Sequence, residues 1–537
     1  MFARYHVESF VPAERSVLER HVTSLEAPAF ALVDLPPVTA AALFARYSRS
    51  PKSLRRLLID EFAGDLGAGA ERAAANSARL GEARAGDLFS RVLAEYGDDS
   101  VAQLAGVHLA CEQVSQPLAK AIEWGRLASY LEQSTRYIAY SDRRDGRYRY
   151  HLDPQLMASD LGSVYAEAMD ALFEAYAACL EPVRAHLDRT LPVQPDVRAR
   201  ARALRALSLD ICRALLPAGT VSNVGVFGSP QAMEQLVMRL RAHPLPEANG
   251  YAELVAGALQ QVIPDFLTRL DRPDRGGAWV DYLRETAAAA DAAAAELLAT
   301  GSPSPAPILG GDSVRLLRWE SDAEERILAA ALAPHTTLPH DEVEAAVRRL
   351  PRERREALFS AIVGVRGNRR HRPGRGFEHA EYTFEIVSDY GAFRDLQRHR
   401  LLTIHWQRLT PALGAAVPEE VEAAGEGARW RGAVARAEAA HERLAGRFPE
   451  QAQYCVTLGH RLRYTMRLNA REAMHLIELR SSPQGHPSYR RTVQEMHRQI
   501  GEVAGHRLVA AAMRFAGSDD VHLPRYAAEA ARSGGAG

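Results

Sequence analysis

A segment rich in proline and glycine divides the 537-residue chain near its middle. Residues 301–312 read GSPSPAPILGGD, and they follow an alanine-rich stretch with helical spacing, ETAAAADAAAAELLATG. Proline and glycine at this density prevent regular helix or strand, and a chain of this length is too long for one ordinary core. The sequence therefore predicts an N-terminal domain over residues 1–300, a linker over 301–312 and a C-terminal domain over 313–537.

Helical periodicity dominates both halves. Apolar residues recur at intervals of three and four in Ser53–Phe62, Pro117–Leu131, Leu161–Ala178 and Trp430–Ala445. Stretches that favour strand are few, and the clearest is Glu381–Val387, EYTFEIV. This mixture predicts a helix-rich α+β protein.

The two halves carry a faint internal repeat. LFSRVLAEYG (88–97) is similar to LFSAIVGVRG (358–367), and WGRLASYLEQSTRY (124–137) can be laid on RHRLLTIHWQRLTP (398–411). The distance along the chain from the first copy to the second is nearly the same for both pairs. A nearly constant offset is what duplication followed by small insertions leaves, although chance is the alternative at this low identity.

Charge and cysteine content narrow the classes of partner. Lys and Arg number 66 against 67 Asp and Glu, so the net charge of −1 gives no general attraction to nucleic acid or to an anionic membrane. No uncharged apolar run reaches the roughly 18 residues of a membrane span. The four cysteines show no metal-binding or disulfide spacing. We expect a cytoplasmic protein without a metal site, which binds small anionic ligands.

Three polar residues alternate within SYLEQSTRY, namely Glu132, Ser134 and Arg136. In an extended segment they would face the same side, because alternate side chains of a strand share a face. Ser and Arg suit a phosphate, and a nearby carboxylate could accept from a sugar hydroxyl or a base N–H. The alternative is a helix in which Glu132 and Arg136 form an ordinary ion pair.

Two further groups of polar residues lie in the C-terminal half. Arg398-His399-Arg400 would suit a pyrophosphate or a nucleotide, although basic tripeptides are also common on solvated helix surfaces. In LNAREAMHLIELR, Asn469 is a good helix N-cap, and Arg471 and His475 share a helix face. A binding surface and a plain amphipathic helix with a polar cap are both open for this segment.

The N-terminal half resembles flavin-dependent thymidylate synthases in the second part of their signature, RHRxxSxNExSxRY. The matching positions are Arg126, Ser129, Glu132, Ser134, Arg136 and Tyr137. Trp124-Gly125 replaces the opening Arg-His of the signature. YGDDSVAQ (96–103) loosely resembles the family's GHxSxxE, and the segment that starts at Arg213, RALLP, resembles its Arg-x-x-Leu-Pro.

The C-terminal half resembles the same family in complementary places. Arg398, His399 and Arg400 match the opening of the signature, but its remainder is lost around Trp406, Arg408 and Thr410. The later Asn-Ala-Arg element reappears as Asn469-Ala470-Arg471, followed by Arg480, and Glu378-His379 is similar to the family's Glu-His pair. Asp395 and Gln453 stand where the family has Gln and Arg.

In the family, each active site forms between subunits, so complementary losses in two fused copies imply one composite site. The resemblance assigns nucleotide binding to Glu132, Ser134, Thr135, Arg136, Arg213 and Arg480. It assigns FAD binding to Glu378, Arg398, His399, Arg400, Asn469, Arg471 and His475. Arg480 would also have the catalytic role of stabilising negative charge that develops on the pyrimidine ring, since a guanidinium cannot act as a base.

The implied fold is a tandem pair of helix-rich domains, each with a small antiparallel sheet. The implied reaction is reductive methylation of dUMP to dTMP, with methylenetetrahydrofolate as carbon donor and NADPH as reductant. There are two alternatives. The protein could carry out another flavin-dependent modification of a pyrimidine nucleotide, or it could bind nucleotide or flavin without catalysis. The resemblance also implies a homodimer that rebuilds a tetramer-like core.

Overall fold

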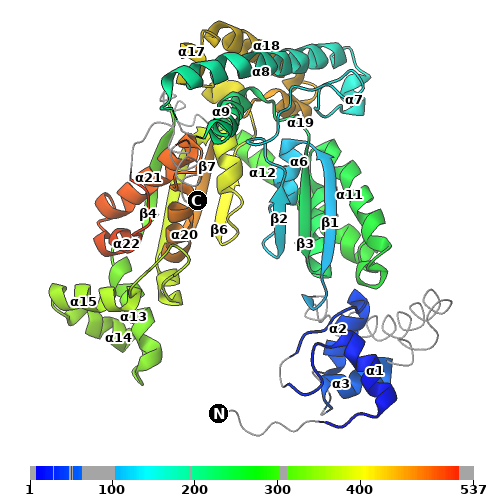
Figure 1. The fold of residues 1–537 in the computed structure, drawn as a ribbon, viewed down its shortest axis with the longest axis vertical. Coiled ribbons are helices and arrows are strands. Elements are labelled where there is room, and N and C mark those ends of the chain that lie inside the picture. Colours follow the sequence, from blue (N-terminus) through cyan, green and yellow to red (C-terminus); the bar gives the residue numbers. More distant parts are fainter. Residues whose placement is uncertain are drawn as a thin grey trace. The chain divides into compact units, whose positions relative to one another are not determined.

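The computed structural model describes residues 8–27, 30–47, 50, 52–62, 103–193, 196–300, 311–518 and 526. The chain forms two compact units (Figure 1). Unit 1 comprises residues 1–111, 125–131 and 224–302, and unit 2 comprises 112–124, 132–223 and 303–537. The boundaries of these units differ from the predicted domain boundary at 301–312, because unit 2 contains segments from both sequence halves. The domains over 1–300 and 313–537 therefore stay a prediction. Residues 88–97 and 301–310 lie outside the described residues, as does most of 96–103.

A three-stranded sheet with the strand order β1-β3-β2 lies mostly in unit 1. Its strands are β1 (Val107–Val114), β2 (Ala128–Glu132) and β3 (Ser222–Gly228). Every second residue of β3 is buried, which indicates that one face of the sheet packs against the core. In the described part of this unit, the helical elements are α1 (Pro12–His21), α2 (Pro37–Tyr47), α3 (Leu54–Leu57), η1 (Leu58–Phe62), α10 (Pro230–Ala242), α11 (Pro246–Gln260), η4 (Pro264–Leu267), η5 (Pro273–Gly277) and α12 (Ala278–Ala299).

Unit 2 contains a four-stranded antiparallel sheet with the order β4-β5-β7-β6. The strands are β4 (Ser313–Trp319), β5 (Glu381–Asp389), β6 (Leu402–Trp406) and β7 (Arg461–Asn469). Tyr382, Phe384 and Ile386 are fully buried on one face of β5. The opposite face carries ion pairs such as Glu385 with Arg463. One face of the sheet therefore supports the core and the other faces solvent.

Helices pack on the buried face of this sheet and beside it. The longest is α8 (Gly162–Thr190), which packs against α9 (Val197–Cys212) and α18 (Gly427–Ala445). The other helical elements of unit 2 are α6 (Gln116–Ile122), α7 (Pro154–Met157), η3 (Arg213–Leu215), α13 (Ala323–Leu332), η6 (Ala333–His335), α14 (His340–Arg349), α15 (Arg352–Val363), η7 (Arg375–His379), α16 (Tyr390–Leu396), η8 (Pro411–Leu413), α17 (Glu419–Ala423), α19 (Pro449–Ala452), η9 (Gln453–Cys455), α20 (Ala470–Arg480), α21 (Pro487–Glu502) and α22 (Arg507–Ala512).

The two sequence halves repeat one order of elements. The strand order β1-β3-β2 recurs as β5-β7-β6. The helices that follow β1 and β5, α6 and α16, are both seven residues long and are capped by Ser115 and Asp389. One constant shift along the chain carries α6 onto α16 and β2 onto β6, and it is the shift that relates 124–137 to 398–411 in the sequence.

Within unit 2 the two copies meet through backbone hydrogen bonds that obey a local pseudo-twofold symmetry. Ala218 N donates to Val456 O at 2.7 Å, and its mate Leu458 N donates to Leu216 O at 2.9 Å. Gly219 N donates to Tyr454 O at 3.0 Å, and its mate Gly459 N donates to Ala214 O at 2.9 Å. A single shift, the one that takes Ala218 to Leu458, relates every bond to its mate. This ladder directly follows Asp210 and Arg213, so it fixes the end of α9 against the C-terminal copy.

Close backbone approach explains the glycines of this ladder. A Cβ on Gly219 would lie 3.2 Å from Tyr454 Cβ, and a Cβ on Gly459 would lie 3.0 Å from Ala214 O. Contacts this short do not accommodate a larger side chain without a shift of the neighbour.

The helix-rich α+β prediction with two small antiparallel sheets is confirmed. The helix expected over Pro117–Leu131 is wrong in its second part, because α6 ends at Ile122 and β2 begins at Ala128. The apparent helical spacing combines apolar residues of a short helix with apolar residues of the strand that follows it. Among the described residues, no helix is long and apolar enough to cross a membrane.

Candidate nucleotide-binding site

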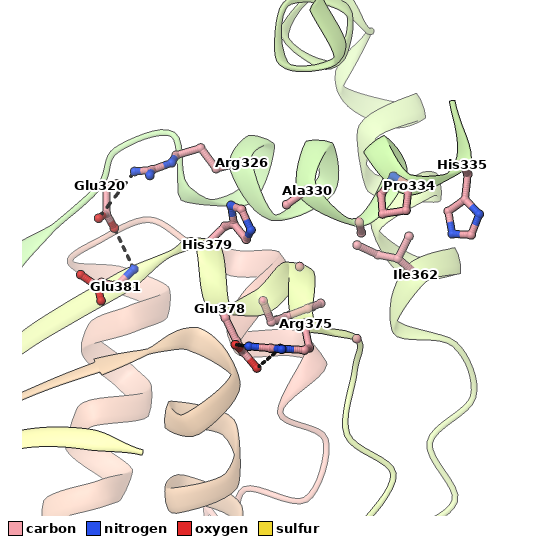
Figure 2. A pocket seen from close by; sticks show the side chains of 14 residues that line it. Glu320, Arg326, Ala330, Pro334, His335, Ile362, Arg375, Glu378, His379 and Glu381 are labelled. Atoms are coloured by element: carbon pink, nitrogen blue, oxygen red, sulfur yellow. Dashed lines mark hydrogen bonds and ion pairs between the residues drawn. The ribbon is translucent and has the colours of Figure 1, made fainter. Parts of the chain in front are cut away.

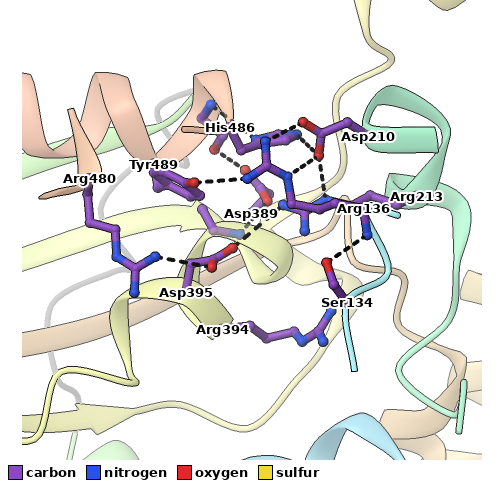
Figure 3. Close-up of polar contacts among 12 residues, drawn as sticks. Ser134, Arg136, Asp210, Arg213, Asp389, Arg394, Asp395, Arg480, His486 and Tyr489 are labelled. Carbon is purple, nitrogen blue, oxygen red and sulfur yellow. Dashed lines mark hydrogen bonds and ion pairs between the residues drawn. The ribbon is translucent and has the colours of Figure 1, made fainter. Parts of the chain in front are cut away.

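Arg136 lies in the loop after β2 and is held by a carboxylate from α9. Its Nε and Nη2 donate to the two oxygens of Asp210 at 2.7 and 2.6 Å, which is a bidentate pair (Figure 3). Nη1 donates to the Tyr489 hydroxyl at 3.1 Å. Burial alone would lower the pKa of Arg136, but the charge of Asp210 outweighs it and raises that pKa. Arg136 therefore stays cationic and is rigidly oriented.

Glu132, at the end of β2, joins basic side chains from both sequence halves. It accepts from Lys120 Nζ at 3.0 Å and from Arg394 Nη2, and Arg398 Nη1 lies 3.5 Å away. Burial would raise the pKa of Glu132, but Arg394, Lys120 and Arg398 hold it at about 2. A helical pair of Glu132 with Arg136 is therefore excluded, because the two residues have different partners.

Asp395, on α16, lies where three guanidinium groups from three elements converge. It accepts a hydrogen bond from Arg398 Nη2 and another from Arg480 Nη1 at 3.3 Å, and Arg213 Nη2 lies 3.9 Å away. Burial would raise the pKa of Asp395, but these arginines lower it far below its ordinary value.

Positive charge exceeds negative charge in this network, which belongs entirely to unit 2. The basic side chains that take part are Lys120, Arg136, Arg213, Arg394, Arg398 and Arg480, and the carboxylates are Glu123, Glu132, Asp210 and Asp395. Six cations against four carboxylates give the network an excess of positive charge. Burial also raises the pKa of Glu123, which can only enlarge the surplus.

Arg213 is the member of this network whose hydrogen-bonding capacity is least used. Its Nε lies 3.5 Å from Asp210 Oδ1, beyond good hydrogen-bond length, and its buried Nη2 has no hydrogen-bond partner among the described residues. Burial lowers the pKa of Arg213. A buried donor without an acceptor is costly, so this atom is suited to a ligand oxyanion.

A cluster of His399, Glu472 and His475 adjoins the network. His399 Nδ1 lies 2.8 Å from Glu472 Oε1, His475 Nδ1 lies 3.3 Å from the same oxygen, and Arg480 Nε donates to His399 Nε2 at 3.1 Å. Burial lowers the pKa of His399 to about 4, so at neutral pH its ring is uncharged and its Nδ1–H donates to Glu472. Burial would raise the pKa of Glu472, but its bonds from both histidines hold it at about 2.

The three side chains of this cluster could also surround a metal ion, since their ligand atoms lie within 4.8 Å of one another. The hydrogen bonds of His399 disfavour metal binding. With Arg480 donating to Nε2, the remaining nitrogen of His399 carries the proton and has no lone pair for a cation.

The remaining predicted residues are more dispersed. Ser134 Oγ accepts from Arg136 N at 3.3 Å, so it stays at the network, and Thr135 between them in the sequence is buried. Arg400 is exposed beside Arg398 and His399. Asn469 caps α20 by accepting from Glu472 N at 2.9 Å, so its side chain has a structural role.

Arg471 and Glu378 form a separate pair beside a cavity of about 860 Å³. Arg471 Nε donates to Pro373 O at 2.9 Å, and its Nη1 lies 3.5 Å from Glu378. Glu378 also pairs with Arg375, and both line the cavity together with His379 and Phe377 (Figure 2). No described contact of Arg471 or Glu378 joins them to Arg136 or Arg480.

A second cavity, of about 700 Å³, adjoins the network on the side of Arg213. Asp210, Arg213, Asp389, His486 and Ser488 line it. It offers room beside the unsatisfied Nη2 of Arg213.

The sequence did not reveal the carboxylates that orient the arginines. Asp210 lies in the amphipathic helix α9, and its partner Arg136 is 74 residues away. Lys120, Arg394 and Tyr489 were missed for the same reason. The only available signal was Asp395, where the sequence departs from the family.

Comparisons with known proteins bear on these residues. The family model described as thymidylate synthase complementing protein matches residues 38–265 and 315–505. The chain belongs to this family. The two matched ranges lie on opposite sides of 301–312, so the family-like region occurs twice and the predicted family membership is confirmed.

Relatives of similar length share nearly the whole chain of this family member. It is 36% identical to a UPF0159 protein of Chlamydia muridarum, over 97% of this chain and 98% of that protein. A UPF0159 protein of Chlamydia pneumoniae is 35% identical over 92% of this chain and 93% of its own length. A UPF0159 protein of Thermoplasma acidophilum is 28% identical over 93% and 99%.

Among solved structures, a UMP/dUMP methylase PolB from Streptomyces cacaoi bound with 5-Br dUMP is 16% identical. The likeness covers 38% of this chain and 97% of that one, with a TM-score of 0.30, which is too low to support a conclusion.

Proposed function

We propose that this protein binds FAD and dUMP and catalyses reductive methylation to dTMP, with methylenetetrahydrofolate as carbon donor and NADPH as reductant. The observation that carries the proposal is the network in unit 2, where Arg136 and Arg213 from the N-terminal half join Arg398 and Arg480 from the C-terminal half. Its excess of positive charge suits a phosphate monoester, whose charge is about −2 at neutral pH.

The nucleotide would enter with its phosphate toward Arg213 Nη2, the buried donor that has no hydrogen-bond acceptor among the described residues. Arg136 is held in place by Asp210 and presents an oriented charge at the same position. Ser134 adds a hydroxyl. Glu132 is ionised and buried, so it keeps Arg394 and Arg398 oriented for the ligand.

Arg480 is suited to the pyrimidine ring. Its Nε and Nη1 have partners in His399 and Asp395, which fixes the plane of the guanidinium. A fixed cation in a site shielded from water stabilises negative charge that develops on a ring oxygen. Arg480 would therefore act as an electrostatic catalyst and not as a base.

The residues present fit a dinucleotide flavin. Arg398 has 32% of its side-chain surface exposed, Arg471 has 27% and His475 has 25%, so cationic and polar groups remain accessible for a pyrophosphate. His399 stays neutral and buried, and it is suited to orienting the flavin through its neighbours. When bound, FAD would supply hydride transfer to the one-carbon unit. Arg400 and Glu378 are proposed at the outer parts of the same cofactor.

A flavin absorbance spectrum with and without dUMP tests this proposal. We expect purified protein to be yellow, dUMP to perturb the flavin bands, and dTMP to form when the carbon donor and NADPH are added. Arg398→Ala should weaken FAD binding, whereas Arg136→Ala should weaken dUMP binding and leave FAD bound. A colourless protein that does not take up FAD would refute the proposal.

Asp395 favours a second candidate, another flavin-dependent modification of a pyrimidine nucleotide. A carboxylate can only accept hydrogen bonds, whereas the Gln of the resembled family both donates and accepts. Tight FAD binding without dTMP formation would support this candidate. The homodimer implied by the resemblance stays a prediction, which the mass of the protein in solution tests.

A further inference from the structure

Asp395 occupies a position that an anionic ligand would otherwise fill. The residue is only 6% exposed, and its carboxylate receives Arg398 from the segment after α16, Arg480 from the end of α20 and Arg213 from η3. A bound oxyanion makes the same kind of contacts, one from each of several arginines.

Asp395 differs from Asp210 in how it holds its partners. Asp210 takes Arg136 in a bidentate pair at 2.6 and 2.7 Å, which uses one whole edge of the guanidinium. Asp395 takes at most one contact from each arginine, and two of these are long, at 3.3 and 3.9 Å. Each guanidinium has five N–H donors, so Arg213 and Arg480, whose contacts with Asp395 are long, can turn to a new acceptor without losing a strong pair.

The repeat shows that this carboxylate is special to one copy. When α6 is laid on α16, Ala121 is equivalent to Asp395 and Lys120 is equivalent to Arg394. Both helices thus carry a basic residue at the first of these two positions along the chain. At the second position only α16 has a carboxylate, and it lies where Arg213, Arg398 and Arg480 converge.

We propose that Asp395 is a built-in counter-ion that competes with the phosphate of the nucleotide, so that it sets the affinity and the charge selectivity of the site. Without ligand, it neutralises part of the arginine cluster and keeps the three guanidiniums oriented. A dianionic phosphate monoester outcompetes the single charge of Asp395 for Arg213 and Arg480, whereas monoanions do not. This inference rests on the proposed function for the identity of the nucleotide, but not for the binding of phosphate.

The test measures binding of inorganic phosphate, dUMP and deoxyuridine to full-length protein and to Asp395→Asn, by calorimetry and by thermal shift. We expect the variant to unfold at a lower temperature without ligand, because the buried Arg213 and the partly buried Arg398 and Arg480 lose a counter-charge. It should bind phosphate and dUMP at least tenfold more tightly, and phosphate should raise its unfolding temperature more than that of the wild type. Weak binding of deoxyuridine should not change.

Asp210→Asn is the matched control, because it removes a carboxylate that orients Arg136 and should weaken dUMP binding. Asp395→Gln, which restores the residue type of the resembled family, serves as a second neutral variant if the Asn variant folds poorly. Unchanged or weaker phosphate binding in both Asp395 variants would overturn the inference, even if the wild type forms dTMP. Tighter phosphate binding without any dTMP formation would uphold it and refute the proposed reaction instead.

Discussion

The two copies of the repeat differ in charge at one equivalent place, the corner formed by the end of a helix and the loop after the second strand of each copy. In the N-terminal copy, Asp210 and Arg213 close α9, and Asp210 clamps Arg136 in a buried pair. The shift that relates the bonds of the backbone ladder makes Glu450 the equivalent of Asp210 and Gln453 the equivalent of Arg213.

In the C-terminal copy this corner is neutral and internally satisfied. Arg408 Nη2 lies 3.0 Å from Glu450 Oε1, with 51% of the Arg408 side chain exposed. Gln453 donates to Glu450 at 2.9 Å and accepts from Leu409 N at 3.2 Å. Gln453 is neutral and stands where the N-terminal copy has Arg213, whose Nη2 has no hydrogen-bond partner among the described residues, so this corner lacks that additional positive charge. This difference supports the proposal that the corner of the N-terminal copy is a ligand site, whereas the same corner of the C-terminal copy is a structural contact.

The largest contrast should appear between Arg136→Ala and Arg408→Ala. Arg136→Ala leaves Asp210 buried without its main partner, so we expect a loss of about 3–5 kcal/mol in the free energy of unfolding. We also expect a loss of at least a hundredfold in dUMP affinity. Arg408→Ala removes a half-exposed arginine from Glu450, which keeps its hydrogen bond from Gln453, and should cost below about 1 kcal/mol.

Chemical denaturation and dUMP titration of both variants measure this contrast. Equal losses in the two variants would mean that the corners are equivalent and that the comparison is wrong.

The next largest difference should be in stability at acid pH. It depends on Glu132, whose equivalent in the C-terminal copy is Trp406. The pKa of Glu132 is held at about 2, below its usual 4.5, so its contribution to stability is full above pH 4.5 and is lost as the pH falls toward 2. The shift corresponds to roughly 3 kcal/mol. Glu132→Gln should flatten this part of the stability profile.

Denaturation between pH 2 and 6 provides the measurement, with Glu181→Gln as the control, since Glu181 forms only an exposed pair with Arg184. If the Glu132 and control variants lose stability with the same dependence on pH, Glu132 is not an ionised centre of the network.

The smallest effect concerns the ladder that joins the copies. Gly459→Ala places a Cβ 3.0 Å from Ala214 O, so we expect a loss of about 1–3 kcal/mol. Gly432 lies within α18 with nothing within 4 Å of its added Cβ, so Gly432→Ala should stabilise the protein by about 0.5–1 kcal/mol. Thermal unfolding compares the two. A neutral Gly459→Ala would show that the backbones do not need this close approach.

The sequence predicted the local features of the site and missed those that depend on distant contacts. The cap of α20 at Asn469 follows from local spacing, and the division of family motifs between the halves follows from the resemblance to the family. The strand β2 was obscured, because Pro117–Leu131 also satisfies helical spacing. Asp210 could not be predicted, because a single aspartate on an amphipathic helix gives no sign of a partner 74 residues away.

We propose that each chain builds one nucleotide site from both of its halves. Calorimetric titration of dUMP into the full-length protein measures the number of sites directly. We predict one dUMP per chain, with binding abolished by Arg136→Ala and by Arg480→Ala and retained by Arg408→Ala. Two sites per chain, or binding that survives Arg136→Ala and is lost in Arg408→Ala, would contradict the account.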